Sequence, residues 1–290
     1  MTVTSAPDHR SKSAVAPLHV IITGGSSGIG AAIADVYAER GANISLIART
    51  ASALADKKRV LEERFAARNQ HFRVETADVR DWPAIGEAVA RCEHELGPCD
   101  ILIVSSGIVD PAPFDVIPAD RFNGQIETNL LGSANAVRAV FAGMRQRRRG
   151  RILMIGSGAG LIGLFGYTAY CASKAGLIGF AEALRQEARP HGISVSICLP
   201  PDTDTPQLAM ERRVRPSEAS AIIGAAPAWS AGAIARVAIR GLDRGKAVTH
   251  PGLQIKFLAY SRSVLAPLLR HWFDRRIAGV MRGKAEGDPH

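Results

Sequence analysis

The chain has 290 residues, of which 47% are hydrophobic and 22% charged, and this composition excludes an intrinsically disordered protein. Its 36 Lys and Arg outnumber 27 Asp and Glu, so the formal net charge of +9 favours anionic partners such as nucleotide phosphates or an acidic membrane surface. The four cysteines stand far apart without a CxxC pair, which argues against a disulfide framework or metal site and favours a cytoplasmic protein.

In chain order, residues 1–17 lack the apolar segment of a signal peptide, so we expect a flexible tail. From residue 18, β-branched runs alternate with helical patterns, which predicts α/β architecture: one doubly wound Rossmann domain over 18–252 with a parallel sheet. The expected strands cover 18–23, 42–48, 72–79, 100–105, 150–157 and 192–200, and the expected helices 28–40, 51–68, 82–96, 120–146 and 168–189. A last strand at 246–250 would make about seven, and the fully apolar runs predict helices on both faces.

Two later segments depart from this alternation of strand and helix patterns. Residues 206–229 mix prolines, charges and scattered apolar residues, and we expect an irregular lid. Residues 253–290 mix large apolar residues with Lys and Arg and contain no uncharged apolar run of ~18 residues, so they predict a basic amphipathic extension and no transmembrane helix. Such an extension would lie on an anionic membrane surface at its cytosolic face, although a helix for domain packing or oligomerisation would have the same pattern. No nucleic-acid module accompanies the charge, so we expect no nucleic-acid partner.

A glycine-rich motif, TGGSSGIG at 23–30, follows the first expected strand and opens the first expected helix. Gly24 permits a tight turn, Gly28 and Gly30 allow close backbone approach, and the helix N-terminus offers N–H groups to a phosphate. In this context the motif predicts a dinucleotide site.

Two residues at strand ends refine this prediction. Arg49 ends the second expected strand, where NAD-selective proteins carry an acid, so the sequence predicts NADPH as cofactor. Asp78 follows the third strand and is the candidate acceptor for the adenine amino group.

Tyr170 and Lys174 lie four residues apart in an expected helix, which puts phenol and ammonium on one face. A phenol with a pKa of about 10 is a poor acid-base catalyst at neutral pH, but a nearby ammonium favours the phenolate and lowers that pKa. With TGGSSGIG, with Ser157 thirteen residues before Tyr170 and with Asn129 in ETNLLG, the spacing resembles the short-chain dehydrogenase/reductase superfamily over residues 18–206.

The resemblance implies an oxidoreductase in which Ser157 donates a hydrogen bond to a substrate carbonyl and Tyr170 protonates its oxygen. It further implies that Lys174 holds the cofactor ribose and tunes Tyr170, that Asn129 anchors a water of the proton relay, and that the protein is a homo-oligomer. Residues 104–107, VSSG, depart from the NNAG of the family and keep only its glycine. The implied cofactor-binding residues are Gly24, Ser26, Ser27, Gly28, Ile29, Gly30, Arg49, Asp78, Val79, Tyr170, Lys174, Pro200, Thr203 and Thr205.

Two less general stretches, GLFGYTAY at 163–170 and PPDTDTP at 200–206, resemble the 3-ketodihydrosphingosine reductase family. This resemblance implies NADPH-dependent reduction of a long-chain keto-lipid, 3-oxosphinganine, to sphinganine. The apolar loop 158–165 suits an alkyl chain, while core packing or an oligomer interface would use the same residues. Asp202 and Asp110 are the candidates for a contact to a substrate ammonium group.

Two other functions stay open from the sequence. A reductase of another keto-lipid, such as a 3-oxoacyl thioester, would carry the same motifs. A non-catalytic NADP-binding sensor would share the fold, although such a protein has no need of the full set Ser157, Asn129, Tyr170 and Lys174.

Overall fold

The apolar runs form one parallel sheet in the computed structural model, which describes residues 17–65, 70–224 and 227–286. Seven strands follow the order β3-β2-β1-β4-β5-β6-β9. Their bounds are β1 His19–Thr23, β2 Asn43–Ala48, β3 Phe72–Thr76, β4 Ile101–Val104, β5 Gly150–Ile155, β6 Ile193–Cys198 and β9 Val248–Thr249. The expected Rossmann architecture is thus confirmed, and residues 1–16 of the expected tail lie outside the described residues.

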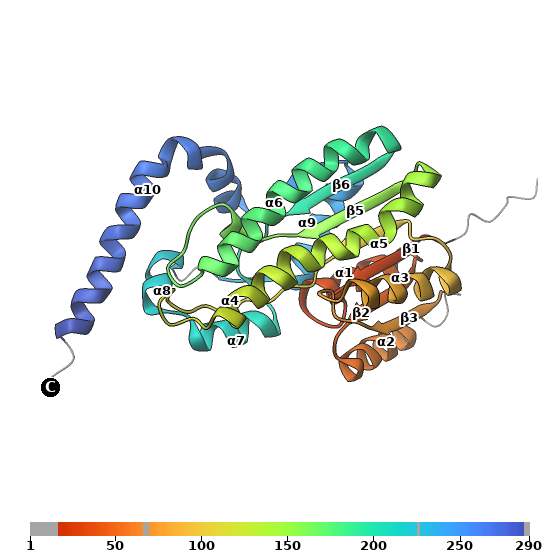
Figure 1. Cartoon of the computed structure of the whole chain (residues 1–290), viewed down its shortest axis with the longest axis horizontal. Coiled ribbons are helices and arrows are strands. Elements are labelled where there is room, and N and C mark those ends of the chain that lie inside the picture. The colour runs from red at the N-terminus through yellow and green to blue at the C-terminus, as the bar shows by residue number, and fades with distance from the viewer. Residues whose placement is uncertain (1–16, 66–69, 225–226, 287–290) are drawn as a thin grey trace, which may run out of the picture.

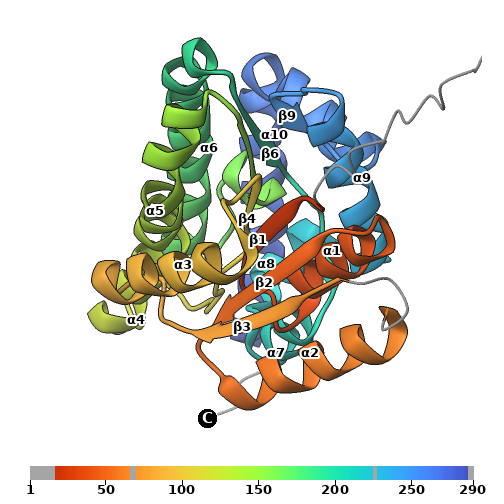
Figure 2. The same cartoon turned by 90° about the vertical axis from the view of Figure 1, so that its right-hand side faces the viewer.

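Helices cover both faces of this sheet (Figure 2). The helices are α1 Gly28–Glu39, α2 Ala51–Phe65, α3 Trp82–Leu96, α4 Ala119–Ile126, α5 Gly132–Arg147, α6 Thr168–Ala188, α7 Pro206–Val214, α8 Ser217–Ile223, α9 Ala231–Asp243 and α10 Leu253–Glu286. One apolar cluster joins the sheet to α3, α5 and α6, and a second joins it to α1, α2 and α9. Neighbouring strand residues such as Ile21 and Ile22 point to opposite clusters, which is why the strands are apolar throughout.

The strand order reverses beside β1. The first three strands run outward to one edge of the sheet, and β4 returns to pair with β1 on its other side. In open α/β sheets of this kind, ligands bind beyond the carboxyl ends of the strands at the reversal. The glycine-rich turn after β1 and the loops after β4 and β5 therefore meet at this edge.

The segment expected to be an irregular lid contains regular structure. Helices α7 and α8 occupy most of 206–224, and the short strands β7, Thr203–Asp204, and β8, Trp229–Ser230, pair at its base. The hydroxyl of Thr205 caps α7 by accepting a hydrogen bond from the Leu208 N–H at 3.2 Å, and Pro206 supplies the first-turn proline that favours a helix start. We call residues 206–224 the lid.

Two further helical features were not expected. The sequence pattern predicted one helix over 120–146, but a π-helical segment, η2 (Glu127–Leu131), separates α4 from α5. Helix α9 was missed, although its Ser230 cap and its buried residues at helical spacing signal it: Ile234, Ala235, Ala238, Ile239 and Leu242.

The C-terminal extension is the long helix α10, with Pro267 in its interior. It begins near the end of β6, and its second half runs beside α8 and away from the sheet (Figure 1). Among the described residues, no helix combines the length and apolar character that crossing a membrane requires.

Candidate active site

Tyr170 and Lys174 lie in the first two turns of α6 and face the same side. The Lys174 ammonium is buried, donates a hydrogen bond to the Ile155 carbonyl at the end of β5 (3.1 Å), and lies 5.7 Å from the centroid of the Tyr170 ring. Burial lowers the pKa of Lys174 to about 8. The predicted lowering of the Tyr170 pKa by Lys174 is wrong: burial raises this pKa above its ordinary value, and the hydrogen bond with the Ser157 hydroxyl offsets only part of the rise.

Ser157 follows β5 and begins the short 3-10 helix η3, Gly158–Gly160. Its Oγ accepts a hydrogen bond from the Ala159 N–H at 3.1 Å, which fixes the side chain at the start of the loop. Because β5 also supplies the carbonyl that binds Lys174, one strand end orients Ser157 and the Tyr170–Lys174 pair. The structure therefore brings these three predicted residues together.

Asn129 lies in the π-helical segment and is completely buried. Its Oδ1 accepts from the Ile108 N–H at 2.8 Å, and its Nδ2 donates to the Ile108 carbonyl at 2.9 Å and to Ser173 Oγ at 3.0 Å. Single π turns inside helices are frequent at functional sites because they re-aim a side chain. The observed role of this side chain is to hold the loop after β4 against α6, and the proton-relay role stays a prediction.

Gly107, the glycine shared with the family, explains how closely these groups approach. A Cβ added there would lie 3.3 Å from Asn129 Oδ1 and 3.5 Å from Lys174 Nζ. The backbone of the loop after β4 therefore passes directly beside both predicted residues.

The glycine-rich turn forms a cradle at the N-terminus of α1. Gly24 has φ +68°, and a Cβ there would lie 2.7 Å from the Ser105 backbone. A Cβ on Gly30 would lie 2.3 Å from the Gly24 carbonyl, so the helix packs directly on the turn. Ser27 precedes α1 without a side-chain capping hydrogen bond, which leaves the first turn open to an anion. This geometry fits the pyrophosphate of a dinucleotide.

The segment after β6 closes the other side of this cradle. A Cβ on Gly28, which has φ +56°, would lie 3.2 Å from Thr205 Cγ2. The Pro200 carbonyl accepts from the Gly158 N–H at 2.9 Å, and the Thr203 hydroxyl donates to the Pro201 carbonyl at 2.9 Å. Residues 200–205 therefore connect the loop of Ser157 to the glycine-rich turn.

The remaining predicted cofactor residues occupy different environments. In the glycine-rich turn, Ser26 and Ile29 are half-buried and Ser27 is exposed. Val79 is buried in the core beside α5, so a cofactor contact would come from its backbone.

The predicted adenine end combines one acid with two arginines. Burial acts to raise the pKa of Asp78, but hydrogen bonds from Arg80 and the nearby charge of Arg49 bring it below its usual value. Arg80 reaches Asp78 Oδ2 with Nη2 at 2.7 Å, whereas Arg49 is exposed just beyond β2. Arg49 therefore faces solvent at the end of β2, and its contact to a 2′-phosphate stays a prediction.

A partly buried charge network that sequence reasoning missed links the lid to the predicted active-site tyrosine. The Tyr167 hydroxyl donates to Glu211 of α7, and the rings of Tyr167 and Tyr170 meet edge to face with centroids 6.3 Å apart. Arg215 binds Glu211 Oε1 at 2.8 Å and Asp202 Oδ2 at 2.9 Å. In the sequence, only the spacing of four residues between Glu211 and Arg215 points to this network, and such spacing is ordinary on helix surfaces.

The two candidates for a substrate ammonium contact lie in different places. Asp202 belongs to the lid network, and its charge together with that of Glu211 acts to raise the pKa of Tyr170. Asp110 is paired with the exposed Arg121 and accepts no hydrogen bond from the lid network. Only Asp202 thus lies in the electrostatic environment of Tyr170.

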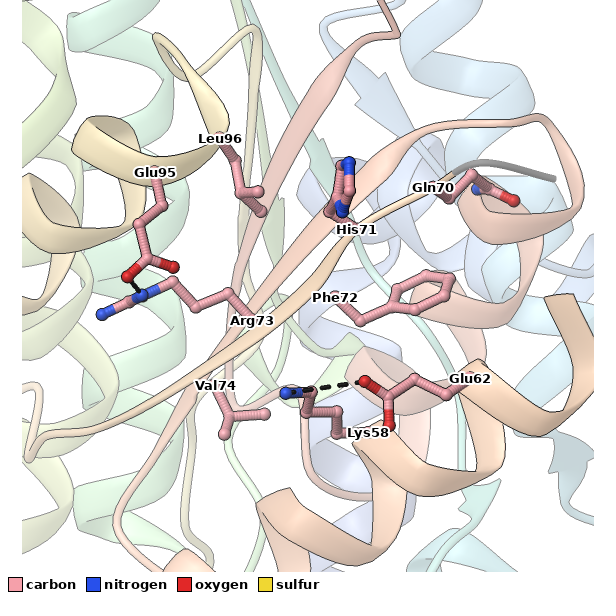
Figure 3. A pocket seen from close by; sticks show the side chains of 9 residues that line it. All are labelled: Lys58, Glu62, Gln70, His71, Phe72, Arg73, Val74, Glu95 and Leu96. Carbon is pink, nitrogen blue, oxygen red and sulfur yellow. Dashed lines mark ion pairs between the residues drawn. The ribbon is translucent and has the colours of Figure 1, made fainter. Parts of the chain in front are cut away.

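Two hollows lie outside this cluster. One of about 730 Å³ lies at the edge strand β3, where Arg73 pairs with Glu95 and Lys58 with Glu62 (Figure 3), and it contains none of the predicted site residues. The other, of about 290 Å³, lies between α6 and the apolar loop 158–165 and is lined by Leu161, Ile162 and Cys171, among others. No group of side chains among the described residues has the composition of a metal site.

Comparison with known proteins agrees with this geometry. Residues 18–216 match the family model for short chain dehydrogenases. The chain is 38% identical to a 3-dehydrosphinganine reductase of Danio rerio over 228 residues, covering 78% of this chain and 69% of that protein. It is 39% identical to a 3-ketodihydrosphingosine reductase of Bos taurus over 201 residues, covering 69% and 60% respectively.

A solved structure shares the same fold. The 3-oxoacyl-[acyl-carrier protein] reductase from Brucella melitensis superimposes with a TM-score of 0.71 at 25% identity, covering 87% of this chain and 96% of that one. The family match extends over strands β1 to β6, the glycine-rich turn and the Tyr170–Lys174 pair, and it implies an NAD or NADP cofactor. By its sequence and its fold, this chain is a member of the short-chain dehydrogenase family of oxidoreductases.

Proposed function

We propose that the protein reduces 3-oxosphinganine to sphinganine with NADPH. The observation that carries this proposal is the 38% identity to a 3-dehydrosphinganine reductase over 228 residues. The half-buried Tyr170 and the buried Lys174 beside Ser157 support the same reaction, because Tyr170 supplies a proton and Ser157 a hydrogen bond for one carbonyl oxygen.

Each residue has a distinct part in this reaction. Ser157 and Tyr170 donate hydrogen bonds to the ketone oxygen, and such donors stabilise the negative charge that develops in the transition state. The raised pKa of Tyr170 keeps the phenol protonated and able to deliver its proton to that oxygen. The Lys174 ammonium, 5.7 Å from the ring centroid, stabilises the phenolate that remains. When bound, the nicotinamide supplies the hydride that reaches the carbonyl carbon.

The choice of NADPH as cofactor rests on the N-terminus of α1 and on Arg49 at the end of β2. The N-terminus of α1 would hold the pyrophosphate, and the exposed Arg49 would pair with the 2′-phosphate of NADPH. Lys174 would contact the ribose, while Asn129 would anchor a water of the proton relay. The free thiols of Cys92, Cys99, Cys171 and Cys198 support a cytoplasmic location.

The second candidate is reduction of a 3-oxoacyl thioester. The fold shared with the Brucella melitensis enzyme at 25% identity favours it. The two candidates differ in the substrate's head group, so a direct comparison of ketones separates them.

The test is NADPH oxidation by the purified protein, followed by absorbance, with 3-oxosphinganine in detergent or with a 3-oxoacyl thioester. We expect turnover of the amino ketone and an about 10³-fold loss in Tyr170→Phe, which removes the proton donor. Turnover of the thioester alone would replace the first candidate by the second. Cofactor binding without turnover of either ketone would contradict both and indicate the nucleotide sensor.

A further inference from the structure

The outward face of α10 carries a continuous apolar stripe. Leu253, Phe257, Tyr260, Val264 and Leu268 are each 64–84% exposed. Their spacing of three and four residues puts them on one face of the helix. Single exposed apolar residues are ordinary, but a contiguous row of five large ones is typical of an interaction surface.

The opposite face of α10 is attached to the body of the protein. A Cβ added to Gly158 would lie 2.7 Å from Ile255 Cδ1, and Arg262 Nη1 donates to the Leu161 carbonyl at 2.9 Å. Near the other end of the helix, Lys284 Nζ donates to Glu218 Oε1 of α8 at 2.6 Å. These contacts fix the rotation of the helix, so the five residues of the stripe lie on the opposite side and face solvent.

Charge decides which partner fits this face. After Pro267 the same stripe continues as the exposed His271, Arg275 and Arg282. Within 253–286 there are seven Lys and Arg and two acidic residues, so this helix carries five of the nine excess positive charges of the chain. If the stripe paired with the stripe of a second copy, a parallel arrangement would place arginines opposite each other and an antiparallel one would place them opposite apolar side chains. An anionic surface instead complements the arginines.

We propose that the outward face of α10 docks on an anionic lipid bilayer. The apolar stripe would enter the headgroup region, and Arg275 and Arg282 would contact lipid phosphates. The inner face contacts Leu161 of the apolar loop and Glu218 of the lid, so a docked helix holds both segments at the bilayer surface. This surface is separate from the Tyr170 site, and the proposal does not depend on which ketone is reduced.

The test is co-sedimentation of the full chain with vesicles of phosphatidylcholine alone or mixed equally with phosphatidylglycerol. We expect binding to the mixed vesicles that falls at least about tenfold in Phe257→Ser/Val264→Ser, because two apolar anchors are lost. Arg275→Gln/Arg282→Gln should weaken it by about 25-fold, since each cation near an anionic surface contributes a factor of about five.

Two matched variants control for apolar content and net charge. Phe114→Ser/Val116→Ser removes two similarly exposed apolar side chains elsewhere, and Arg145→Gln/Arg189→Gln removes the same charge elsewhere. Both should sediment like the wild type, with circular dichroism showing that every variant folds.

Three results would overturn the proposal. One is a wild-type chain that sediments with neither kind of vesicle, and another is equal weakening in the control variants. The third is a dimer, seen by sedimentation velocity, that Phe257→Ser/Val264→Ser dissociates while vesicle binding is absent, because the face would then be an interface between copies.

Discussion

Lys174 illustrates at the residue scale how burial prepares a group for chemistry. Its side chain is buried against the end of β5, and desolvation lowers the pKa of the ammonium to about 8. The spacing to Tyr170 was visible in the sequence, but the burial depends on β5 and on the loop at Gly107, which come from distant parts of the chain.

This pKa predicts a pH dependence. The Lys174 ammonium is present below pH about 8 and is lost as the pH rises through that value, so kcat/KM for ketone reduction should fall there. Lys174→Arg keeps its charge to much higher pH, so its residual activity should lack this decline. Steady-state rates across the pH range, at constant cofactor saturation, measure both profiles. An identical decline in the variant would assign the titration to another group.

Arg49 makes the prediction for cofactor choice. A charge-assisted hydrogen bond contributes about 1.5–3 kcal/mol, so Arg49→Asp should lower kcat/KM for NADPH by about 10- to 100-fold and leave that for NADH equal or higher. Arg145→Asp makes the same change in net charge at an exposed position away from the cradle and should change neither value. If Arg49→Asp lowers kcat/KM equally for NADPH and NADH, this side chain does not bind the 2′-phosphate.

At the scale of elements, the position of the lid depends on ion pairs that are largely shielded from water. The Arg215 side chain is 8% exposed and stands between the carboxylates of Asp202 and Glu211. These contacts join α7 to the segment after β6, and through Tyr167 to the start of α6. The lid is therefore bonded to Tyr167, whose ring contacts that of Tyr170 in the predicted site.

Arg215→Leu should open the lid. Removing the cation leaves two poorly hydrated carboxylates without their partner, which costs about 2–4 kcal/mol given the partial exposure of Asp202. Hydrogen exchange of the α7 amides should accelerate accordingly, whereas Arg212→Leu, an exposed position of the same helix, should leave exchange nearly unchanged. Equal protection in both variants would show that the network does not hold the lid.

At the scale of the whole molecule, α5 and α6 cover one face of the sheet and present their other sides outward (Figure 2). The exposed side of α6 carries the small residues Ala172, Ala175 and Gly179, which allow another helix to approach closely. We therefore propose a homo-oligomer built on these helices, as the family resemblance implies.

Light scattering should give the wild type a mass at least twice the 30.8 kDa of the chain. Gly179→Arg should reduce it to the monomer, because the added side chain would obstruct this face of α6. Gly86→Arg, at an open position of α3, serves as the control and should keep the oligomer. A monomeric wild type would contradict the proposal directly.

The sequence by itself determined the features that depend on neighbouring residues. Composition and period were enough to predict the strands and the sheet. The glycine-rich turn and the Tyr170–Lys174 spacing depend on neighbouring residues, so these motifs were enough to predict the dinucleotide site and to carry the family resemblance. The alternation of apolar runs with amphipathic ones likewise predicted helices on both faces, because only a strand covered twice is apolar throughout.

The tertiary structure decided whatever depends on contacts across long sequence separations. Asn129 is aimed by a π turn, and its partners Ile108 and Ser173 come from two other segments, so neighbouring residues do not reveal its position. The pairing of Arg215 with Asp202 required the lid to fold back on the strand end. The composition of residues 253–290 predicted a basic amphipathic extension, but only the contacts to Leu161 and Glu218 show which face of α10 is covered, because burial is a property of the assembled fold.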